Sequence, residues 1–258
     1  MELQALRSRP ELETAADLHL ELARLYRRVQ ARVPLPSITI TADLVDRHQR
    51  EATPILPFED IPVEPSDLRL MVRQTADVLR RFGALEDDDH GRIQELGRDA
   101  RLMTVTREWY RAGHSGEGEM LDEVLRLALQ PFLSRCAEIL QPWPELSRWT
   151  HPHCALCGGE PTLAVITPAA ERHLVCGRCE LRWKWEPLTC PYCGNDDRAR
   201  ITSFATADGQ YRVYGCDGCQ RYLKAYDGRR TARPMMPIVE AVATLPLDAA
   251  AIQRGYTA

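Results

Sequence analysis

Eight of the nine cysteines in this 258-residue chain form four Cys-x-x-Cys pairs, all within residues 154–219. Two thiolates separated by two residues can turn onto one metal ion, and two such pairs complete a tetrahedral shell of four sulfurs. A single pair would be ambiguous between a metal site and a redox dithiol, but the repetition favours metal. We therefore predict two metal ions per chain, bound by Cys154, Cys157, Cys176, Cys179, Cys190, Cys193, Cys216 and Cys219.

The cysteine-rich segment is an internal duplication. Residues 154–158 (CALCG) and residues 190–194 (CPYCG) each open a stretch of strand-like residues, followed by a second cysteine pair and an aromatic strand. Each copy therefore resembles one complete ribbon module. This predicts sequential grouping, with the first two pairs on one ion and the last two on another. An alternative, in which pairs from different copies share an ion, stays open. Gly158 and Gly194 are expected to adopt positive φ in the turns that follow the second thiol.

Length and charge limit the other possibilities. The chain is longer than two ribbons require, so a separate domain with its own core is expected. The sequence has no apolar run that would span a bilayer, and residues 1–7 lack a secretory signal, which predicts a cytoplasmic protein. Thiols in that reducing compartment bind metal more often than they form disulfides. The net charge of −4 supplies no strong field for nucleic acid or membranes.

Residues 1–150 show apolar residues at helical spacing. The pattern predicts helices over residues 18–29, 68–82, 93–109 and 120–140, with Pro131 either kinking the last or dividing it. The predicted fold class is α+β, in which an all-α helical domain (1–150) precedes two tandem modules of the rubredoxin-like or zinc-ribbon type. The first four-cysteine ribbon covers residues 151–188 and the second covers residues 189–230. A C-terminal tail (231–258) is expected to pack back on the body.

Several other residues have a structural interpretation. Cys136 is predicted to be a small core residue, and the acidic run at 86–89 a solvated loop. Residues 142–153 resemble a stiff hinge, and His151 and His153 are not assigned as ligands, because eight thiolates already fill two shells. The ribbon aromatics are assigned to sheet packing in preference to a partner contact: Trp183, Trp185, Tyr222 and Tyr226.

No catalytic constellation stands out. A closed four-thiolate shell has no open position for Lewis-acid chemistry, and the sequence contains neither a His-Glu-x-x-His pair nor a phosphate loop. We expect a binding protein and not an enzyme. Three alternatives remain: a rubredoxin-like electron carrier, a ribbon-type nucleic-acid binder and a thiol oxidoreductase. Nucleic-acid binding is disfavoured because acidic residues alternate with the arginines of residues 171–200. The oxidoreductase is disfavoured because one redox site needs one accessible pair.

The ordered motifs of the second half resemble the formate dehydrogenase accessory protein FdhE family. They are residues 154–158, 176–179 with Trp183, 190–193, 216–219 with residues 222–224, then the tail 237–248 and Gly255-Tyr256. Residues 1–150 add only a similar helical region. The resemblance implies a cytoplasmic maturation factor for respiratory formate dehydrogenase, an exported molybdo-selenoenzyme with iron–sulfur clusters.

The same resemblance implies rubredoxin-like iron in the four-cysteine sites and direct contact with the catalytic subunit before export. Thiolate chemistry by itself would favour zinc. We expect the contact surface where the helical and ribbon parts meet, around residues 149–153, because clefts between domains are common recognition sites.

Overall fold

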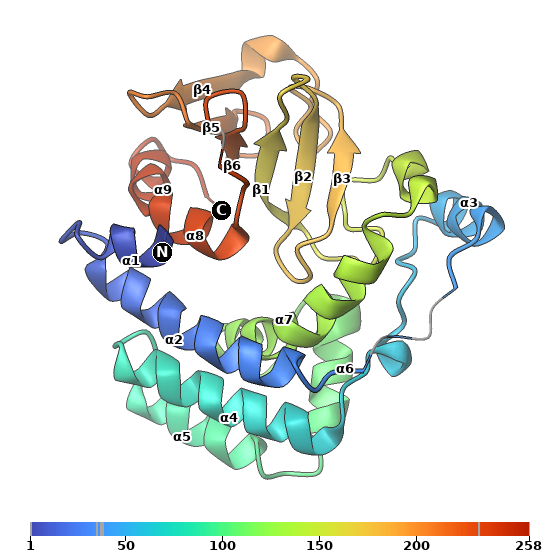
Figure 1. The fold of residues 1–258 in the computed structure, drawn as a ribbon, viewed down its shortest axis with the longest axis vertical. Helices are drawn as coiled ribbons and strands as arrows, with labels where there is room; N and C mark the ends of the chain where they lie inside the picture. Colours follow the sequence, from blue (N-terminus) through green and yellow to red (C-terminus); the bar gives the residue numbers. More distant parts are fainter. Residues whose placement is uncertain (1, 35, 37–38, 232, 258) are drawn as a thin grey trace.

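The computed structural model describes residues 2–34, 36, 39–231 and 233–257. A helical N-terminal part is followed by a six-stranded sheet and two further helices (Figure 1). The helices are α1 (Glu2–Leu6), α2 (Glu13–Gln30), α3 (Ala42–Glu51), α4 (Pro65–Arg81), α5 (Asp87–Leu96), α6 (Leu102–Ala112), α7 (Glu119–Leu140), α8 (Pro237–Ala243) and α9 (Leu245–Ile252). The strands are β1 (Pro161–Ile166), β2 (Arg172–Cys176), β3 (Arg182–Trp185), β4 (Ile201–Ala205), β5 (Tyr211–Cys216) and β6 (Arg221–Asp227). The predicted α+β class, with a helical part before two four-cysteine modules, is confirmed.

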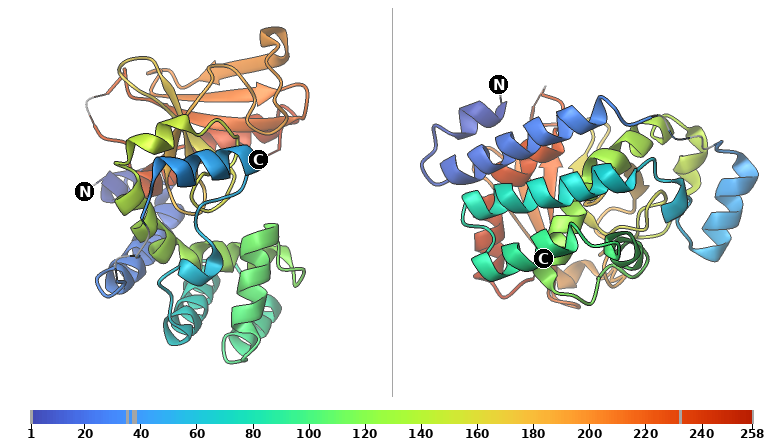
Figure 2. Two further views of the ribbon diagram at one scale, coloured as in Figure 1. Left: turned by 90° about the vertical axis from the view of Figure 1, so that its right-hand side faces the viewer. Right: turned by 90° about the horizontal axis from the view of Figure 1, so that it is seen from below.

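Helix α7 is the centre of the helical part. It continues through Pro131, and it is buried on most sides because its apolar residues face α2, α4 and the sheet together. Figure 2 shows the sheet on one side of the molecule, with α4 and α5 on the opposite side. The helices predicted at residues 18–29 and 68–82 correspond to α2 and α4.

Two predictions for the helical part are wrong. The acidic run at residues 86–89 is not a loop: Glu86 precedes α5, and Asp87, Asp88 and Asp89 form its first turn. Carboxylates are favourable there because the N-terminal end of a helix carries a partial positive charge. The helix predicted over residues 93–109 is divided into α5 and α6 at Gly97. A Cβ atom on Gly97 would lie 2.7 Å from the Arg73 side chain, so close packing against α4 explains the glycine.

Helix α3 has no clear signal in the apolar spacing. Its start nevertheless has a recognisable signal, because the Thr41 side chain accepts a hydrogen bond from the Leu44 amide and caps the helix. The predicted hinge contains a short 3₁₀ helix (Pro144–Arg148), and it is anchored to α3. Arg148 Nη1 lies 3.1 Å from both carboxylate oxygens of Asp46, and the Gln49 side chain bonds Thr150.

The two cysteine-containing copies form one continuous sheet. Its strand order is β3-β2-β1-β6-β5-β4, so each copy contributes three antiparallel strands. The copies join where β1 and β6 pair in parallel, with Ala164 opposite Ala225. We therefore do not expect the two copies to unfold independently.

The largest cluster of buried apolar residues crosses the boundary between the helices and the first copy. It includes Leu129 and Phe132 of α7 together with Cys154, Leu174 and Trp183. The boundary predicted at residues 150/151 thus lies inside a shared core, and the division into domains stays a prediction. Of the ribbon aromatics, Trp183, Tyr222 and Tyr226 are buried and Trp185 is partly buried, which confirms their packing role.

The C-terminal helices connect the two halves of the molecule. Val239 and Val242 of α8 pack with Leu3 of α1, with Ala16 of α2 and with Leu12, which precedes α2. In α9, Leu247 and Ala251 pack against the sheet, in a cluster with Val213 and Tyr222. Figure 1 shows α8 and α9 between α1 and strands β4–β6.

Candidate metal centres

The first four-cysteine group lies where the sheet meets the helices. Cys154 and Cys157 occupy the turn before β1, Cys176 ends β2, and Cys179 lies in the turn before β3. The Sγ atoms of Cys154 and Cys179 are 3.5 Å apart, as are those of Cys157 and Cys176, and all four Sγ atoms lie within 4.8 Å of one another. Sulfurs about 2.3 Å from a tetrahedral zinc ion would be about 3.8 Å apart. The four sulfurs therefore fit one tetrahedral ion.

The second four-cysteine group repeats this arrangement at the other half of the sheet. The Sγ atoms of Cys190 and Cys219 are 3.7 Å apart, and those of Cys193 and Cys216 are 3.6 Å apart. All four again lie within 4.8 Å of one another. The predicted sequential grouping of the thiols is confirmed. Occupancy of each group by a metal ion stays a prediction, and the choice between iron and zinc is open.

Local backbone structure explains how each pair closes. Gly158 (φ 71°) and Gly194 (φ 73°) adopt positive φ as expected, and their amides donate to the carbonyls of Cys154 and Cys190. The second pair of each copy is followed by a further left-handed residue, Glu180 (φ 64°) and Gln220 (φ 58°). Sequence reasoning missed these two positions because neither is glycine. Their identical place after Cys179 and Cys219 is the signal that could have found them.

Histidines do not contribute to either group. Within the described residues, the two clusters with metal-binding geometry consist of cysteines alone. The His151 Nε2 atom lies 2.7 Å from the Gln49 carbonyl oxygen, and the His151 ring stacks on His153 at 5.4 Å. The exclusion of His151 and His153 from the metal ligands stays a prediction.

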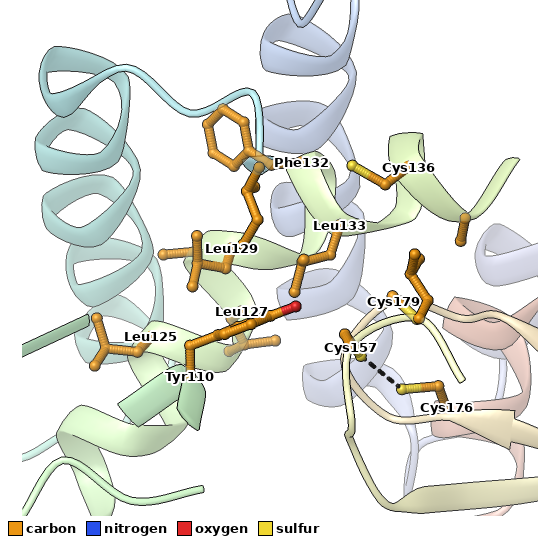
Figure 3. Close-up of a cluster of buried hydrophobic side chains, with 14 of the residues drawn as sticks. Tyr110, Leu125, Leu127, Leu129, Phe132, Leu133, Cys136, Cys157, Cys176 and Cys179 are labelled. Carbon is orange, nitrogen blue, oxygen red and sulfur yellow. Dashed lines mark hydrogen bonds between the residues drawn. The ribbon is translucent and has the colours of Figure 1, made fainter. Parts of the chain in front are cut away.

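The two groups differ in their surroundings. Each of the four cysteines of the first group is at most 1% exposed, whereas Cys193 is exposed and Cys219 partly exposed. Figure 3 shows Tyr110 and the α7 side chains Leu127 and Leu133 beside Cys157, Cys176 and Cys179. Burial raises the pKa of the Cys154 and Cys179 thiols. A metal ion that bound there would displace the protons of these two thiols.

Cys136 lies in the apolar core on α7 and is fully buried, which confirms its assignment as a core residue. Burial raises the pKa of its thiol to about 12. The thiolate, which is the reactive form of cysteine, is therefore suppressed at neutral pH.

The junction around residues 149–153 is more closed than we expected. Trp149 is 1% exposed, and its Nε1 atom donates to the His153 carbonyl oxygen at 2.7 Å. Trp149 is thus a core residue and cannot present a contact surface. An open groove of about 950 Å³ lies beside it, lined by His153, Pro54, Tyr110 and Arg178 among other residues. This groove lies between the helical part and the first four-cysteine group.

No family model and no curated protein matches the sequence. Among solved structures, the chain is similar to the crystal structure of the FdhE protein from Pseudomonas aeruginosa, with a TM-score of 0.68. The similarity covers 99% of this chain and 90% of that protein, at 19% sequence identity. Within the described residues, no helix combines the length and apolar character needed to cross a bilayer. At this level of identity the comparison establishes a common fold, so the chain has the fold of the FdhE protein along nearly its whole length.

Proposed function

We propose that this protein is a cytoplasmic accessory factor for the maturation of respiratory formate dehydrogenase, and that it binds the catalytic subunit before export. The main observation that supports this proposal is the fold that the chain shares with the FdhE protein over 99% of its length. The ordered cysteine motifs, which resemble the FdhE family, point independently to the same role.

The thiol geometry supports a binding role. Four sulfurs at tetrahedral spacing form a closed set, which leaves no coordination position for a substrate. In each group the cysteines would hold one ion and fix the turns that connect the strands. We propose iron in these sites from the family resemblance, with zinc as the alternative that thiolate chemistry allows.

The contact surface for the catalytic subunit is proposed at the groove between the helical part and the first four-cysteine group. Trp149 itself is excluded from this surface because it is buried. His153 and Tyr110 belong to the wall of the groove, and Arg178 lies at the same wall with its guanidinium 4.6 Å from the Trp109 ring centroid. Both halves of the molecule thus contribute to one concave surface.

A deletion strain without a second copy of the gene tests the role. We expect the catalytic subunit to be synthesised but respiratory formate oxidation to be lost, with recovery when the wild-type chain is supplied. Capture of the catalytic subunit from the cytoplasm by the tagged chain tests the partner. Normal formate oxidation in the deletion strain would contradict the proposed role.

The metal is tested separately by element analysis of freshly isolated protein. Ferric thiolate sites absorb visible light, whereas zinc sites are colourless. Two equivalents of iron with visible absorption would support the assignment, and two equivalents of zinc in colourless protein would overturn the iron assignment alone.

The second candidate function is rubredoxin-like electron transfer to a client metalloenzyme. The exposure of Cys193 favours it, because a redox partner could approach that group closely. A colour change that reverses on reduction and reoxidation of the isolated protein is the expected sign.

A further inference from the structure

The duplication allows the two four-cysteine groups to be compared position by position. Cys157 and Cys193 close the first turn of their copies, and Cys179 and Cys219 close the second. Cys157 and Cys179 are buried, whereas Cys193 is exposed and Cys219 partly exposed. The same local fold therefore buries all four cysteines of the first group, whereas in the second group only Cys190 and Cys216 are buried.

The helical part covers the first turn of the first copy. The amides of Ile55 and Leu56 donate to the carbonyls of Ala155 and Leu156, at 2.8 and 2.9 Å. Tyr110 in turn donates its hydroxyl to the Leu56 carbonyl at 2.9 Å. The segment before α4 is thus held down onto the cysteine turn from both sides.

The second turn of the first copy is held by Arg178. Its Nη1 atom donates to the Tyr110 carbonyl at 3.1 Å, and its guanidinium lies 4.6 Å from the Trp109 ring centroid. Apolar residues of α7 lie in the same buried cluster as these cysteines (Figure 3). These contacts leave each of the four cysteines of the first group at most 1% exposed.

The second copy lacks equivalent cover. A Cβ atom on Gly158 would lie 3.3 Å from Pro54, whereas one on Gly194 would meet no atom within 4 Å. Residues 196–200 are exposed, and so are Asp217, Gly218 and Gln220 around Cys219. Solvent and other solutes therefore reach Cys193 directly.

We propose that the second four-cysteine group is a metal-exchange site whose ligands Cys193 and Cys219 can be replaced by external thiols, while the first group is purely structural. Replacement exchanges one metal–sulfur bond for another, so no electron is transferred. The proton that the incoming thiol loses is taken up by the released cysteine. The inference rests on the proposal that both groups bind metal.

Chelation kinetics test the inference. The full chain is loaded with two equivalents of zinc and mixed with glutathione and 4-(2-pyridylazo)resorcinol, which changes colour when it binds zinc. We expect one equivalent to leave quickly and the other at least about 100-fold more slowly, because release from a buried site requires local opening of the core. Parallel alkylation with iodoacetamide, read by mass spectrometry, should label Cys193 and Cys219 in the fast phase.

Two matched variants show which four-cysteine group releases zinc in the fast phase and which in the slow phase. Cys193→Ser should remove the fast equivalent and leave the slow one unchanged. Arg178→Ala removes a contact that covers the first group, so it should accelerate the slow phase and leave the fast phase unchanged. Release of both equivalents with a single rate constant, or earlier labelling of Cys154 and Cys157, would overturn the inference.

The number of zinc equivalents that the chain binds tests metal binding by both groups apart from the exchange at the second group. Uptake of fewer than two equivalents would overturn both the exchange site and metal binding by both groups. Formate oxidation in the deletion strain does not enter the kinetic measurement, so failure of the accessory role and failure of the exchange site are distinguishable.

Discussion

Cys136 shows at the scale of one residue how position decides the chemistry of a thiol. It is fully buried on α7, and burial raises its pKa to about 12. In native, metal-loaded protein at pH 8 we expect iodoacetamide to leave Cys136 unmodified while Cys193 reacts, because only the thiolate is nucleophilic. Mass spectrometry of the alkylated protein measures this. Modification of Cys136 at a rate similar to that of a free thiol would show that α7 opens readily.

The same residue predicts a loss of stability in alkaline solution. The folded pKa of Cys136 is about 12 and lies above that of an unfolded thiol, so the folded state retains the proton longer. The stability that the protonated Cys136 thiol contributes to the folded state is fully present below the unfolded pKa of about 8.5. This stability is lost as the pH rises toward the folded pKa. Denaturant titrations between pH 8 and 10.5 should therefore show a shallower decline for Cys136→Ala than for wild type. If the free energy of unfolding declined equally in the two proteins, groups other than Cys136 would cause the loss of stability in alkaline solution.

Glu240 anchors helix α8 to the rest of the molecule. Its carboxylate is fully buried and accepts hydrogen bonds from Arg233 Nη1 and Nη2, from the Tyr211 hydroxyl and from the Met236 amide. Removal of one partner from a buried ion pair typically costs about 3–5 kcal/mol. We expect Glu240→Ala to lower the free energy of unfolding by that amount, as measured by urea denaturation.

Glu59→Ala is the matched control for Glu240→Ala. Glu59 also bonds two arginines, Arg107 and Arg111, but its side chain is exposed. Exposed ion pairs contribute about 1 kcal/mol or less. Equal effects of the two substitutions would contradict the anchoring role of Glu240.

Strands β1 and β6 couple the two four-cysteine copies through their parallel pairing. Substitution of a ligand should nevertheless have unequal effects, because Cys154 lies in the core shared with the helices and Cys190 does not. Cys154→Ala removes a ligand inside the shared core and should lower the free energy of unfolding of the whole chain by about 3 kcal/mol or more. Cys190→Ala should release the second ion and disturb β4–β6 with a smaller loss. Element analysis and thermal unfolding of both variants measure these effects, and similar melting temperatures would contradict the larger contribution of the shared core.

The sequence was most informative where spacing itself is the constraint. The spacing of the eight cysteines predicts which thiols form each group of four, because two Cys-x-x-Cys turns in one ribbon can be brought together in only a few arrangements. The acidic run at residues 86–89 was misread, because carboxylates suit both a loop and the start of a helix. The parallel pairing of β1 with β6 and the burial of Trp149 could not be predicted, because both depend on packing between residues far apart in the chain.

The whole molecule is organised around one core that joins the helices to the first four-cysteine copy. We therefore expect the metal-loaded chain to unfold in one cooperative transition. Circular dichroism at the helix band should report mainly α2, α4 and α7. Tryptophan fluorescence should be sensitive to the junction through Trp149 and Trp183. Both signals should share one midpoint in urea, because separate midpoints require domains with separate cores.

A fragment of residues 1–150 provides the matched test of that core. Without the first copy it would expose α7 residues such as Leu133 and Cys136, which pack in the same cluster as Cys157 and Cys179. We expect the fragment to lack a cooperative transition, and a fragment of residues 1–188 with one bound ion to regain part of it. Cooperative unfolding of residues 1–150 alone, with a midpoint close to that of the full chain, would show instead that the helical part is an independent domain and that the shared core adds little to its stability.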